Sequence, residues 1–240
     1  MIDAHLHLGR LKEPKLLLTQ AKACGLSSFV TSSTTLDDLS INLDLAKSFN
    51  GFCSLGLHPC FIKNLEDFSY FAQKIAAHPN LRAIGECGFD KKSPLDFTLQ
   101  QELVKKHLEL ASKLNLPVSF HLTSHGQDAV SLVKLYKVRG MVHWAQGSVE
   151  TIKAYLRADL YLSFCTSSKI TATMEEIFYI TPKEQILVES DFDEIKAQRM
   201  AYDVNSLYAL VEKIAKIKGL SAKTLEDQIS ENFFNLYGGK

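Results

Sequence analysis

Two histidines, separated by one residue, interrupt the apolar segment MIDAHLHL at the start of the chain. Side chains alternate between the two faces of a β-strand, so His5 and His7 would point to the same side if this segment is a strand. Two imidazoles on one face can bind a metal ion, although they can also share a face by accident. The pair alone therefore does not establish a site, and further ligands must come from elsewhere in the chain.

More imidazole and carboxylate groups lie toward the ends of later apolar segments: His58, Glu86, His121, His143 and Asp191. Each has a simple explanation on its own, since a lone histidine such as His143 is more often a packing residue and Asp191 could begin a helix. Their repetition at one end of successive segments is hard to explain as a series of accidents. Imidazoles and carboxylates together are the ligands that suit zinc, manganese or another divalent ion.

The number of candidate ligands favours two metal ions over one. Four histidines and two carboxylates from this set of seven residues already exceed the coordination of a single tetrahedral ion, and Glu86 could bridge two ions because a carboxylate has two oxygens. Such a pair of ions activates water and stabilises the displaced oxygen of a phosphoester. Asp191 could bind metal and also accept a proton from the attacking water. Glu189, two residues earlier on the same strand face, is predicted to orient a ligand.

The remaining histidines and the tryptophan fit this set less well. His78 and His107 lie in predicted helices, where a solvated or partly packed surface position is expected. His125 follows the fifth predicted strand by two residues, and the sequence leaves open whether it reaches the site. Trp144 follows His143, so strand alternation turns it away from the site unless the strand ends there, and a packing role is predicted rather than a platform for base stacking.

The elements that must position these groups alternate between short apolar segments and longer amphipathic ones. The short segments are predicted as strands, over residues 2–8, 27–33, 52–58, 81–87, 117–123, 141–145, 160–165 and 186–191. Helical patterns separate them, and Ser148 and Ser221 are expected to cap two of these helices. The C-terminal part of the chain is predicted to be helical throughout.

This alternation is typical of a parallel α/β fold, and eight repeats in 240 residues favour a single-domain (β/α)8 TIM-like barrel over residues 1–240. An open doubly wound sheet is the alternative, but the motifs GxGxxG and GxxxxGK[ST] are absent. A barrel places the carboxyl ends of its strands on one face, so the candidate ligands would converge there.

Composition limits the function classes. The chain has 27 Lys and Arg against 27 Asp and Glu, and the resulting net charge of zero counts against a tight, sequence-reading nucleic-acid binder. Five scattered cysteines without a CxxC motif are typical of reduced thiols in a cytoplasmic protein. The first residues do not resemble a signal peptide, and no apolar stretch has membrane-spanning length, so no membrane association is expected.

Several segments resemble the TatD family of metal-dependent deoxyribonucleases, within the wider amidohydrolase-like barrels. IDAHLHL is similar to the opening I-D-x-H-x-H of that family, LGLHP to its G-x-H-P, and AIGECGFD to its A-I-G-E-x-G-L-D. VHWAQGS and ILVESDFD resemble its later H-x-F-S-G-S and L-L-x-E-T-D-x-P. The order of the motifs holds from residue 2 to 193, and ISENFFNLYG resembles the closing segment, with Asn232 or Asn235 at the family's asparagine.

The resemblance implies hydrolysis of phosphodiester bonds in DNA at a site that holds divalent metal, described as magnesium-dependent and also compatible with zinc or manganese. It implies a set of metal ligands: His5, His7, Glu86, His121, His143 and Asp191. It also implies that His58 contacts the substrate phosphate. DNA is the expected partner as substrate, and no obligate protein partner is evident.

The substrate-contacting residues depart from the family pattern. The family often has Ser-Arg after the fifth-strand histidine, whereas HLTSHG contains no arginine, which weakens the prediction of a polynucleotide substrate. Phe192 and Asp193 replace Ala-Pro after Asp191 and add negative charge. Two alternatives therefore stay open: a metal-dependent hydrolase of a small phosphoester, lactone or amide, and a non-catalytic metal-binding barrel.

Overall fold

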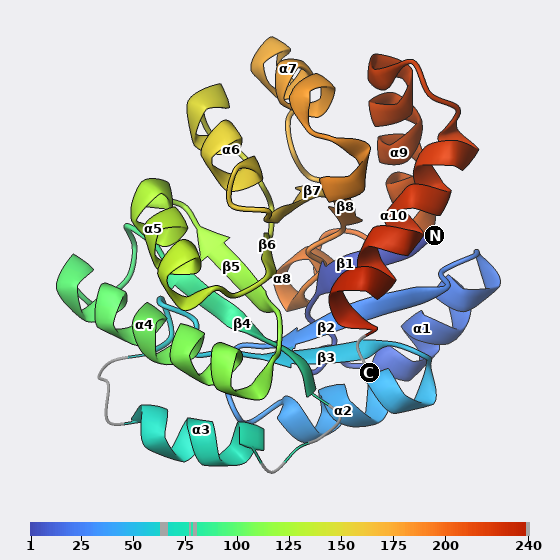
Figure 1. Ribbon diagram of the computed structural model, residues 1–240. Coiled ribbons are helices and arrows are strands. Elements are labelled where there is room, and N and C mark those ends of the chain that lie inside the picture. Colours follow the sequence, from blue (N-terminus) through green and yellow to red (C-terminus); the bar gives the residue numbers. More distant parts are fainter. Residues whose placement is uncertain (63–66, 77, 79–80, 239–240) are drawn as a thin grey trace.

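The computed structural model describes residues 1–62, 67–76, 78 and 81–238. Within these residues, eight parallel strands form one sheet in the order β1 to β8, with helices around it (Figure 1). The strands are β1 (Ile2–Leu6), β2 (Ser28–Ser33), β3 (Phe52–Leu55), β4 (Leu81–Phe89), β5 (Val118–Leu122), β6 (Gly140–Val142), β7 (Tyr161–Cys165) and β8 (Ile186–Glu189). Each strand pairs with the next one along the chain, which confirms the predicted (β/α)8 arrangement.

Helices follow the strands along the chain. They are α1 (Pro14–Ala23), α2 (Leu39–Ser48), α3 (Asp67–Ala76), α4 (Phe97–Leu114), α5 (Gly126–Tyr136), α6 (Val149–Leu156), α7 (Ala172–Ile180), α8 (Glu194–Ala197), α9 (Val204–Lys218) and α10 (Ala222–Tyr237). Ser148 and Ser221 cap α6 and α10 as predicted, because each hydroxyl accepts a hydrogen bond from the backbone N–H three residues later. The C-terminal part is not helical throughout, since residues 198–203 form a loop between α8 and α9.

The strands and the helices around them share an apolar core. All six residues of β2 are buried, as expected for a parallel strand covered on both faces. On α4, Val104, Leu108 and Ala111 are buried at the three- and four-residue spacing of one helix face. Asp96 caps the start of α4 by accepting a backbone hydrogen bond, and Asn115 in the left-handed conformation ends it. The caps set the two ends of α4, and its buried face packs against β4.

Hydrogen bonds join the first and last strands at the end of the barrel where the predicted site lies. The N–H of Asp191 donates to the carbonyl oxygen of His5 at 2.9 Å. The buried carboxylate of Asp3 on β1 accepts from the backbone N–H of Ser190 at 3.0 Å and from its hydroxyl at 2.6 Å. The hydroxyl of Tyr202 donates to the same carboxylate at 2.8 Å. The segment after β8 is therefore held against β1.

Five strands, β5 among them, end earlier than predicted, and one continues further. β1, β3, β6 and β8 stop before a predicted site residue, which places these residues in the following loops: His7, His58, His143 and Asp191. β4 continues to Phe89, so Glu86 lies inside the strand. Gly88 permits this extension, because a Cβ there would lie 1.9 Å from the carbonyl oxygen of His121 on β5.

The prediction that His107 lies at the surface is wrong. Its side chain is fully buried on α4, with its ring centre 5.2 Å from that of Phe71. Its Nδ1 donates to the carbonyl oxygen of Leu103 at 2.8 Å, and its Nε2 accepts from the N–H of Leu57 at 3.0 Å. This histidine therefore ties α4 to the loop that carries His58. The sequence pattern could not reveal this, because the partner of Nε2 lies on another element.

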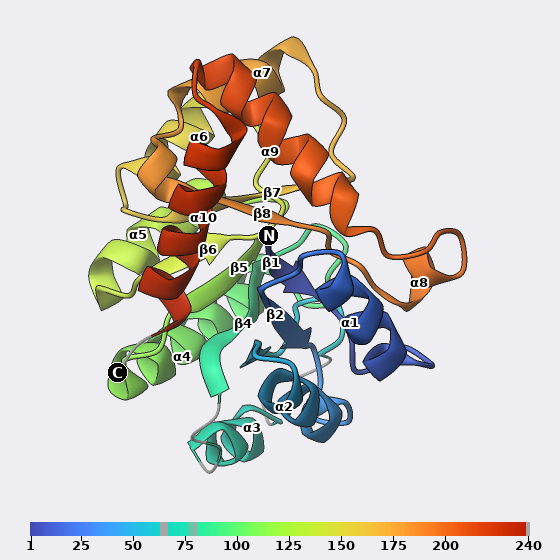
Figure 2. The same cartoon turned by 90° about the vertical axis from the view of Figure 1, so that its right-hand side faces the viewer.

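The two C-terminal helices pack against each other beside β1 and β8 (Figure 2). Asn232 on α10 is buried, and its Nδ2 donates to the carbonyl oxygens of Lys183 and Ile186 at 2.7 and 2.8 Å. Asn235 on the same helix is exposed. Asn232 therefore stabilises the start of β8.

Other sequence expectations concern the thiols and the membrane. All five cysteines, each at a described position, have free thiols. Across the described part of the chain, no helix has both the length and the apolar character needed to cross a membrane. His78 is half-buried, in agreement with the expected partly packed position, but it lies after α3 and not in a helix as predicted.

Candidate metal centre

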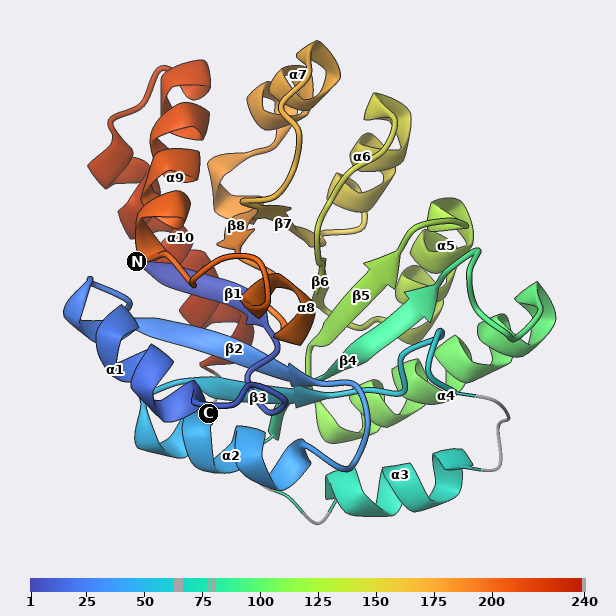
Figure 3. The ribbon, with the colours of Figure 1, turned by 180° about the vertical axis from the view of Figure 1, so that it is seen from behind.

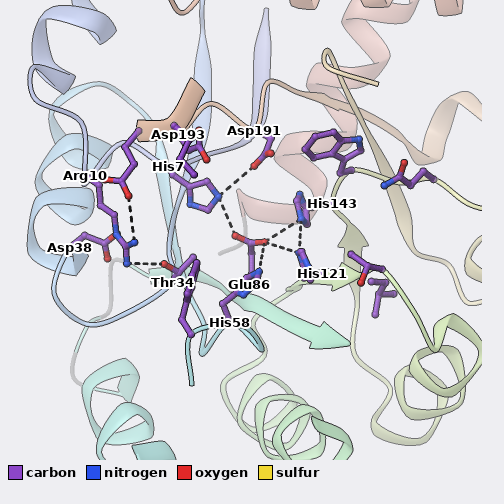
Figure 4. A pocket seen from close by; sticks show the side chains of 17 residues that line it. His7, Arg10, Thr34, Asp38, His58, Glu86, His121, His143, Asp191 and Asp193 are labelled. Atoms are coloured by element: carbon purple, nitrogen blue, oxygen red, sulfur yellow. Dashed lines mark hydrogen bonds and ion pairs between the residues drawn. The ribbon is translucent and has the colours of Figure 1, made fainter. Parts of the chain in front are cut away.

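Glu86 lies at the centre of a cluster at the barrel mouth, with imidazoles on both sides (Figure 4). Its Oε1 lies 3.3 Å from Nε2 of His5 and 3.2 Å from Nε2 of His7. Its Oε2 lies 3.1 Å from Nε2 of His143 and 3.4 Å from Nδ1 of His121. The two oxygens of one carboxylate therefore face two different pairs of imidazole nitrogens.

Asp191 adds a second carboxylate to the His5 and His7 side of the cluster. Its Oδ1 lies 3.5 Å from Nε2 of His7 and 3.9 Å from Nε2 of His5. Its backbone has a φ of 47°, a left-handed conformation that aspartate adopts more readily than most residues. The Nζ of Lys196 on α8 donates to the carbonyl oxygen of Asp191 at 2.6 Å and to its Oδ2 at 3.2 Å. One carboxylate oxygen thus faces the cluster while the other is held by an ammonium group.

Two further carboxylates contact the imidazoles on the other side of Glu86. Oε1 of Glu189 lies 3.2 Å from Nδ1 of His143, and Oδ2 of Asp90 lies 2.7 Å from Nε2 of His121. When an ionised carboxylate accepts the proton of one ring nitrogen, the other nitrogen presents its lone pair. The structure places Glu189 where such a partner was predicted. Asp90 was missed, although it lies in the same AIGECGFD motif as Glu86.

Ser32 on β2 contacts both histidines of the first pair. Its carbonyl oxygen accepts from Nδ1 of His7 at 3.0 Å, and its hydroxyl lies 3.1 Å from Nδ1 of His5. The hydroxyl of Ser54 on β3 donates to the Ser32 hydroxyl at 2.8 Å. Because a carbonyl oxygen can only accept, Nδ1 of His7 carries a proton, and in the neutral ring its Nε2 presents a lone pair.

A cavity of about 270 Å³ opens onto the cluster, and most of the predicted site residues line it: His7, His58, Glu86, His121, His143 and Asp191. The short helix α8 lies across part of the barrel mouth, where Glu194 and Ile195 also line the cavity (Figure 3). Nε2 of His58 lies 3.8 Å from Oε2 of Glu86. Its Nδ1 accepts a hydrogen bond from the N–H of Cys60 at 3.1 Å, so the proton of the neutral ring is on Nε2.

A model of the family described as TatD related DNase matches residues 2–238 of the chain. The chain belongs to this family. It is 24% identical over 253 residues to an uncharacterized metal-dependent hydrolase of Bacillus subtilis, covering 99% of this chain and 98% of the relative. It is 24% identical over 279 residues to the deoxyribonuclease Tat-D of Schizosaccharomyces pombe, covering 95% and 89%. A TatD homologue from Escherichia coli has the same fold, with a TM-score of 0.86 and 18% identity over 100% of this chain and 98% of that one.

Membership of the TatD family confirms three predictions from the sequence: the family itself, the barrel fold and the enzyme class of metal-dependent hydrolase. All residues that the resemblance implied as ligands lie in one cluster in this TatD protein, although they come from strands and loops far apart in the sequence. Their convergence follows from the closed barrel, which brings the ends of all strands to one mouth.

The aromatic residues of this TatD protein differ in part from expectation. The prediction that Trp144 packs away from the site is wrong, because β6 already ends at Val142 and Trp144, with a φ of 43°, lines the cavity. Nζ of Lys196 lies 4.9 Å from the centre of its ring. His125 is not among the described residues that line the cavity, and its ring stacks on Phe97 with centres 4.0 Å apart.

Arg10 is a cavity residue that the sequence analysis missed. It lies between β1 and α1 and lines the cavity on the side of His7 (Figure 4). Its Nη2 donates to Oγ1 of Thr34 at 3.2 Å, and its other nitrogens lie 3.6 Å from Asp38 and 3.9 Å from Glu194. The arginine expected of TatD proteins after the fifth strand is absent, but this loop brings a guanidinium to the other side of the cavity. Its position just after HLHL was the only signal in the sequence.

The ionisation of the cluster fits divalent cations. Burial lowers the pKa of His7, but hydrogen bonds with Asp191 and Glu86 outweigh burial and raise this pKa to about 10. Burial raises the pKa of Glu86, but the charges of His5 and His143 outweigh it and hold the pKa well below its usual value. The cluster therefore stabilises positive charge between its carboxylates. Divalent ions can replace the imidazole protons there, as metal binding to histidine requires.

Proposed function

We propose that this TatD protein hydrolyses phosphodiester bonds in DNA with two divalent ions, magnesium, manganese or zinc, at the barrel mouth. The observation that carries the proposal is the position of Glu86, whose Oε1 faces one pair of histidines while its Oε2 faces another. A carboxylate placed in this way is suited to bridge two ions. The similarity to the deoxyribonuclease Tat-D of Schizosaccharomyces pombe supports DNA as the substrate.

The cluster divides into two groups of ligands that share Glu86. One ion would be held by His5, His7 and Asp191, and the other by His121 and His143. With Glu86 shared, the second group has three protein ligands and would leave a coordination position for water or substrate, as in catalytic rather than structural metal sites. When bound, the ions would supply activated water and neutralise charge on the phosphate.

Asp191 is proposed to accept the proton of the attacking water. Burial raises the pKa of its carboxyl group, but the hydrogen bond with His7 and the charge of His143 outweigh burial and lower the pKa. The carboxylate is therefore ionised at neutral pH, with Oδ1 toward the cluster and Oδ2 held by Lys196. Oδ1, which faces the cluster, is therefore the oxygen that would bind an ion and take a proton from the water beside it.

His58 is proposed to bind a phosphate oxygen of the substrate. Its Nδ1 is engaged by the N–H of Cys60, so the ring proton lies on Nε2, the nitrogen nearest Glu86. Burial lowers the pKa of His58 to about 4, so the ring is neutral at pH 7. A neutral N–H donor next to the metal ligands suits a phosphate oxygen, because it adds a hydrogen bond without repelling the ions.

Cleavage of labelled DNA tests this function. Metal-reconstituted wild-type protein is expected to cleave single- or double-stranded DNA, whereas Asp191→Ala is not. Asp44→Ala on α2, at an exposed position, is the matched control and should keep the wild-type rate. Cleavage by the wild type no faster than by Asp191→Ala rejects the proposal. Elemental analysis should find about two divalent ions per chain, and no uptake of offered metal would favour the non-catalytic barrel instead.

A small substrate is the second candidate, and the charge around the cavity favours it. Asp38, Asp193 and Glu194 line the cavity beside Arg10. Negative side chains at the entrance repel a long polyanion and admit a small phosphoester, lactone or amide more readily. Turnover of such esters or amides by metal-loaded protein that does not cleave DNA would establish this alternative.

A further inference from the structure

A second cavity of about 240 Å³ adjoins the first and shares three lining residues with it: Thr34, His58 and Phe61. Its other walls come from the segment after β2, the loop after β3 and α3, where Tyr70 lines it. Because His58 and Phe61 belong to both cavities, a substrate bound beside His58 can extend from the metal centre into the second cavity.

Two exposed aromatic rings line this second cavity. Phe61 is 57% exposed and Tyr70 is 55% exposed. The ring centre of Phe61 lies 4.9 Å from that of His58 and 5.7 Å from Cζ of Arg10. Nζ of Lys74 lies 5.1 Å from the ring centre of Tyr70. Exposed rings next to cations are the combination with which proteins bind the bases and phosphates of single strands.

The guanidinium of Arg10 is available to a phosphate. Its side chain is 34% exposed, and its hydrogen bonds go to the hydroxyls of Thr34 and Thr35 at 3.2 and 3.4 Å. The carboxylates of Asp38 and Glu194 lie 3.6 and 3.9 Å away, beyond hydrogen-bond distance. A phosphate that accepts two N–H groups from Arg10 would bind more strongly than these neighbours do.

We propose that Arg10 and Phe61 form a nucleotide subsite next to the metal centre. The guanidinium binds a phosphate adjacent to the scissile one, and the ring of Phe61 stacks on a base that enters the second cavity against Tyr70. The identity of the ligand rests on the proposed function. Stacking needs a free base face and tolerates every base, so the subsite selects unpaired strands without reading their sequence.

Binding of two labelled single strands tests the subsite: a short oligothymidylate and an abasic strand of the same length. Fluorescence anisotropy with Mg²⁺ uses Asp191→Asn protein as the parent, so that the strand stays intact. Phe61→Leu should weaken oligothymidylate binding about tenfold and leave the abasic strand unaffected. Phe61→Trp, which keeps an aromatic ring, should bind oligothymidylate more tightly than the abasic strand, as the parent does. Arg10→Gln should weaken both strands and reduce the salt dependence by about one phosphate contact, a slope change of about 0.7.

Tyr179→Leu and Arg157→Gln, at exposed positions on α7 and after α6, are the matched controls and should bind both strands like the parent. The proposal is overturned if the parent binds neither strand or binds both equally, if Phe61→Leu weakens both by the same factor, or if Arg10→Gln leaves the salt dependence unchanged. DNA cleavage by the wild type is measured separately. If the variants bind as predicted but the wild type does not cleave DNA, the proposed function is refuted and the subsite is kept. If the wild type cleaves DNA but the Phe61 and Arg10 variants bind both strands like the parent, the subsite alone is refuted.

Discussion

At the scale of single residues, each imidazole on the His121 and His143 side of Glu86 is held by a carboxylate on its far nitrogen. Asp90 contacts His121 and Glu189 contacts His143, so both rings have one nitrogen directed at Glu86. Such outer carboxylates orient metal-binding histidines and raise their basicity. Replacing Asp90 or Glu189 should therefore lower the metal affinity more than it lowers the stability of the fold.

Asp90→Asn is expected to weaken metal binding about tenfold to a hundredfold, because a neutral amide oxygen accepts the hydrogen bond from Nε2 of His121 more weakly than a carboxylate does. Isothermal titration of metal-free protein with Mn²⁺ measures the change. Asp44→Asn, at an exposed position on α2, should bind like the wild type. Wild-type affinity in Asp90→Asn would show that the 2.7 Å contact with His121 does not orient this ring.

Lys196 fixes Asp191 through hydrogen bonds to its carbonyl and carboxylate oxygens and also bonds the carbonyl oxygen of Ser190 at 3.0 Å. Lys196→Met is expected to lower kcat about tenfold, because losing a charged hydrogen bond leaves the carboxylate free to turn away. Lys196→Arg should restore part of the rate. Steady-state kinetics measure the change in kcat. Lys153→Met, at an exposed position on α6, is the control for the loss of one positive charge. A change in KM alone would contradict the positioning role.

At the scale of elements, the points where strands end decide which side chains reach the site. β6 ends at Val142, so the backbone turn after it brings both His143 and Trp144 to the cavity, which strand alternation would not allow. On α4, His107 packs inward and accepts the N–H of Leu57. The position of the loop that carries His58 thus depends on a helix that contributes nothing to the metal ligands.

His107→Gln is expected to lower the free energy of unfolding at pH 7 by about 1–3 kcal/mol, because a buried hydrogen-bond partner is lost. Burial lowers the pKa of His107 from 6.5 to about 4. The neutral ring therefore stabilises the fold fully above pH 6.5, and this stabilisation, up to about 3 kcal/mol, is lost as the pH falls toward 4. Denaturation of metal-free protein at several pH values should show the two stabilities converging at low pH.

The partly exposed His78 provides the control for that experiment, since His78→Gln should follow the wild type across the pH range. Parallel curves of stability against pH for the wild type and His107→Gln would mean that the pKa of His107 is the same in the folded and unfolded states.

At the scale of the whole molecule, the barrel closes through contacts between the first strand and the segment after the last one. The bond from Asp191 N–H to the His5 carbonyl oxygen joins two candidate ligands directly. A metal ion bound by both would therefore connect the two edges of the sheet. Metal binding and global stability should be coupled in this protein, because a ligand that binds only the folded state stabilises it.

Metal at about a hundredfold above its Kd is expected to raise Tm by about 5–10 °C. Glu86→Gln should abolish the increase, because the amide has only one oxygen able to face a cation. Glu102→Gln, exposed on α4, should retain it. Differential scanning calorimetry with and without chelator measures the shift, and an equal shift in Glu86→Gln would exclude Glu86 from the metal centre.

The sequence by itself determined the residue types of the candidate metal centre, their order along the chain and the alternation of strands and helices. These are local properties, since a histidine or carboxylate at the end of an apolar segment is visible without knowing its neighbours. The tertiary structure decided which atoms face one another: both oxygens of Glu86, the contacts of Asp90 and Lys196, and the presence of Arg10 and Trp144 in the cavity. Those depend on strand ends, loop backbones and packing between elements distant in sequence, which no local pattern encodes. The pair His5 and His7 therefore indicates metal binding, and the closed barrel brings the other candidate ligands beside it.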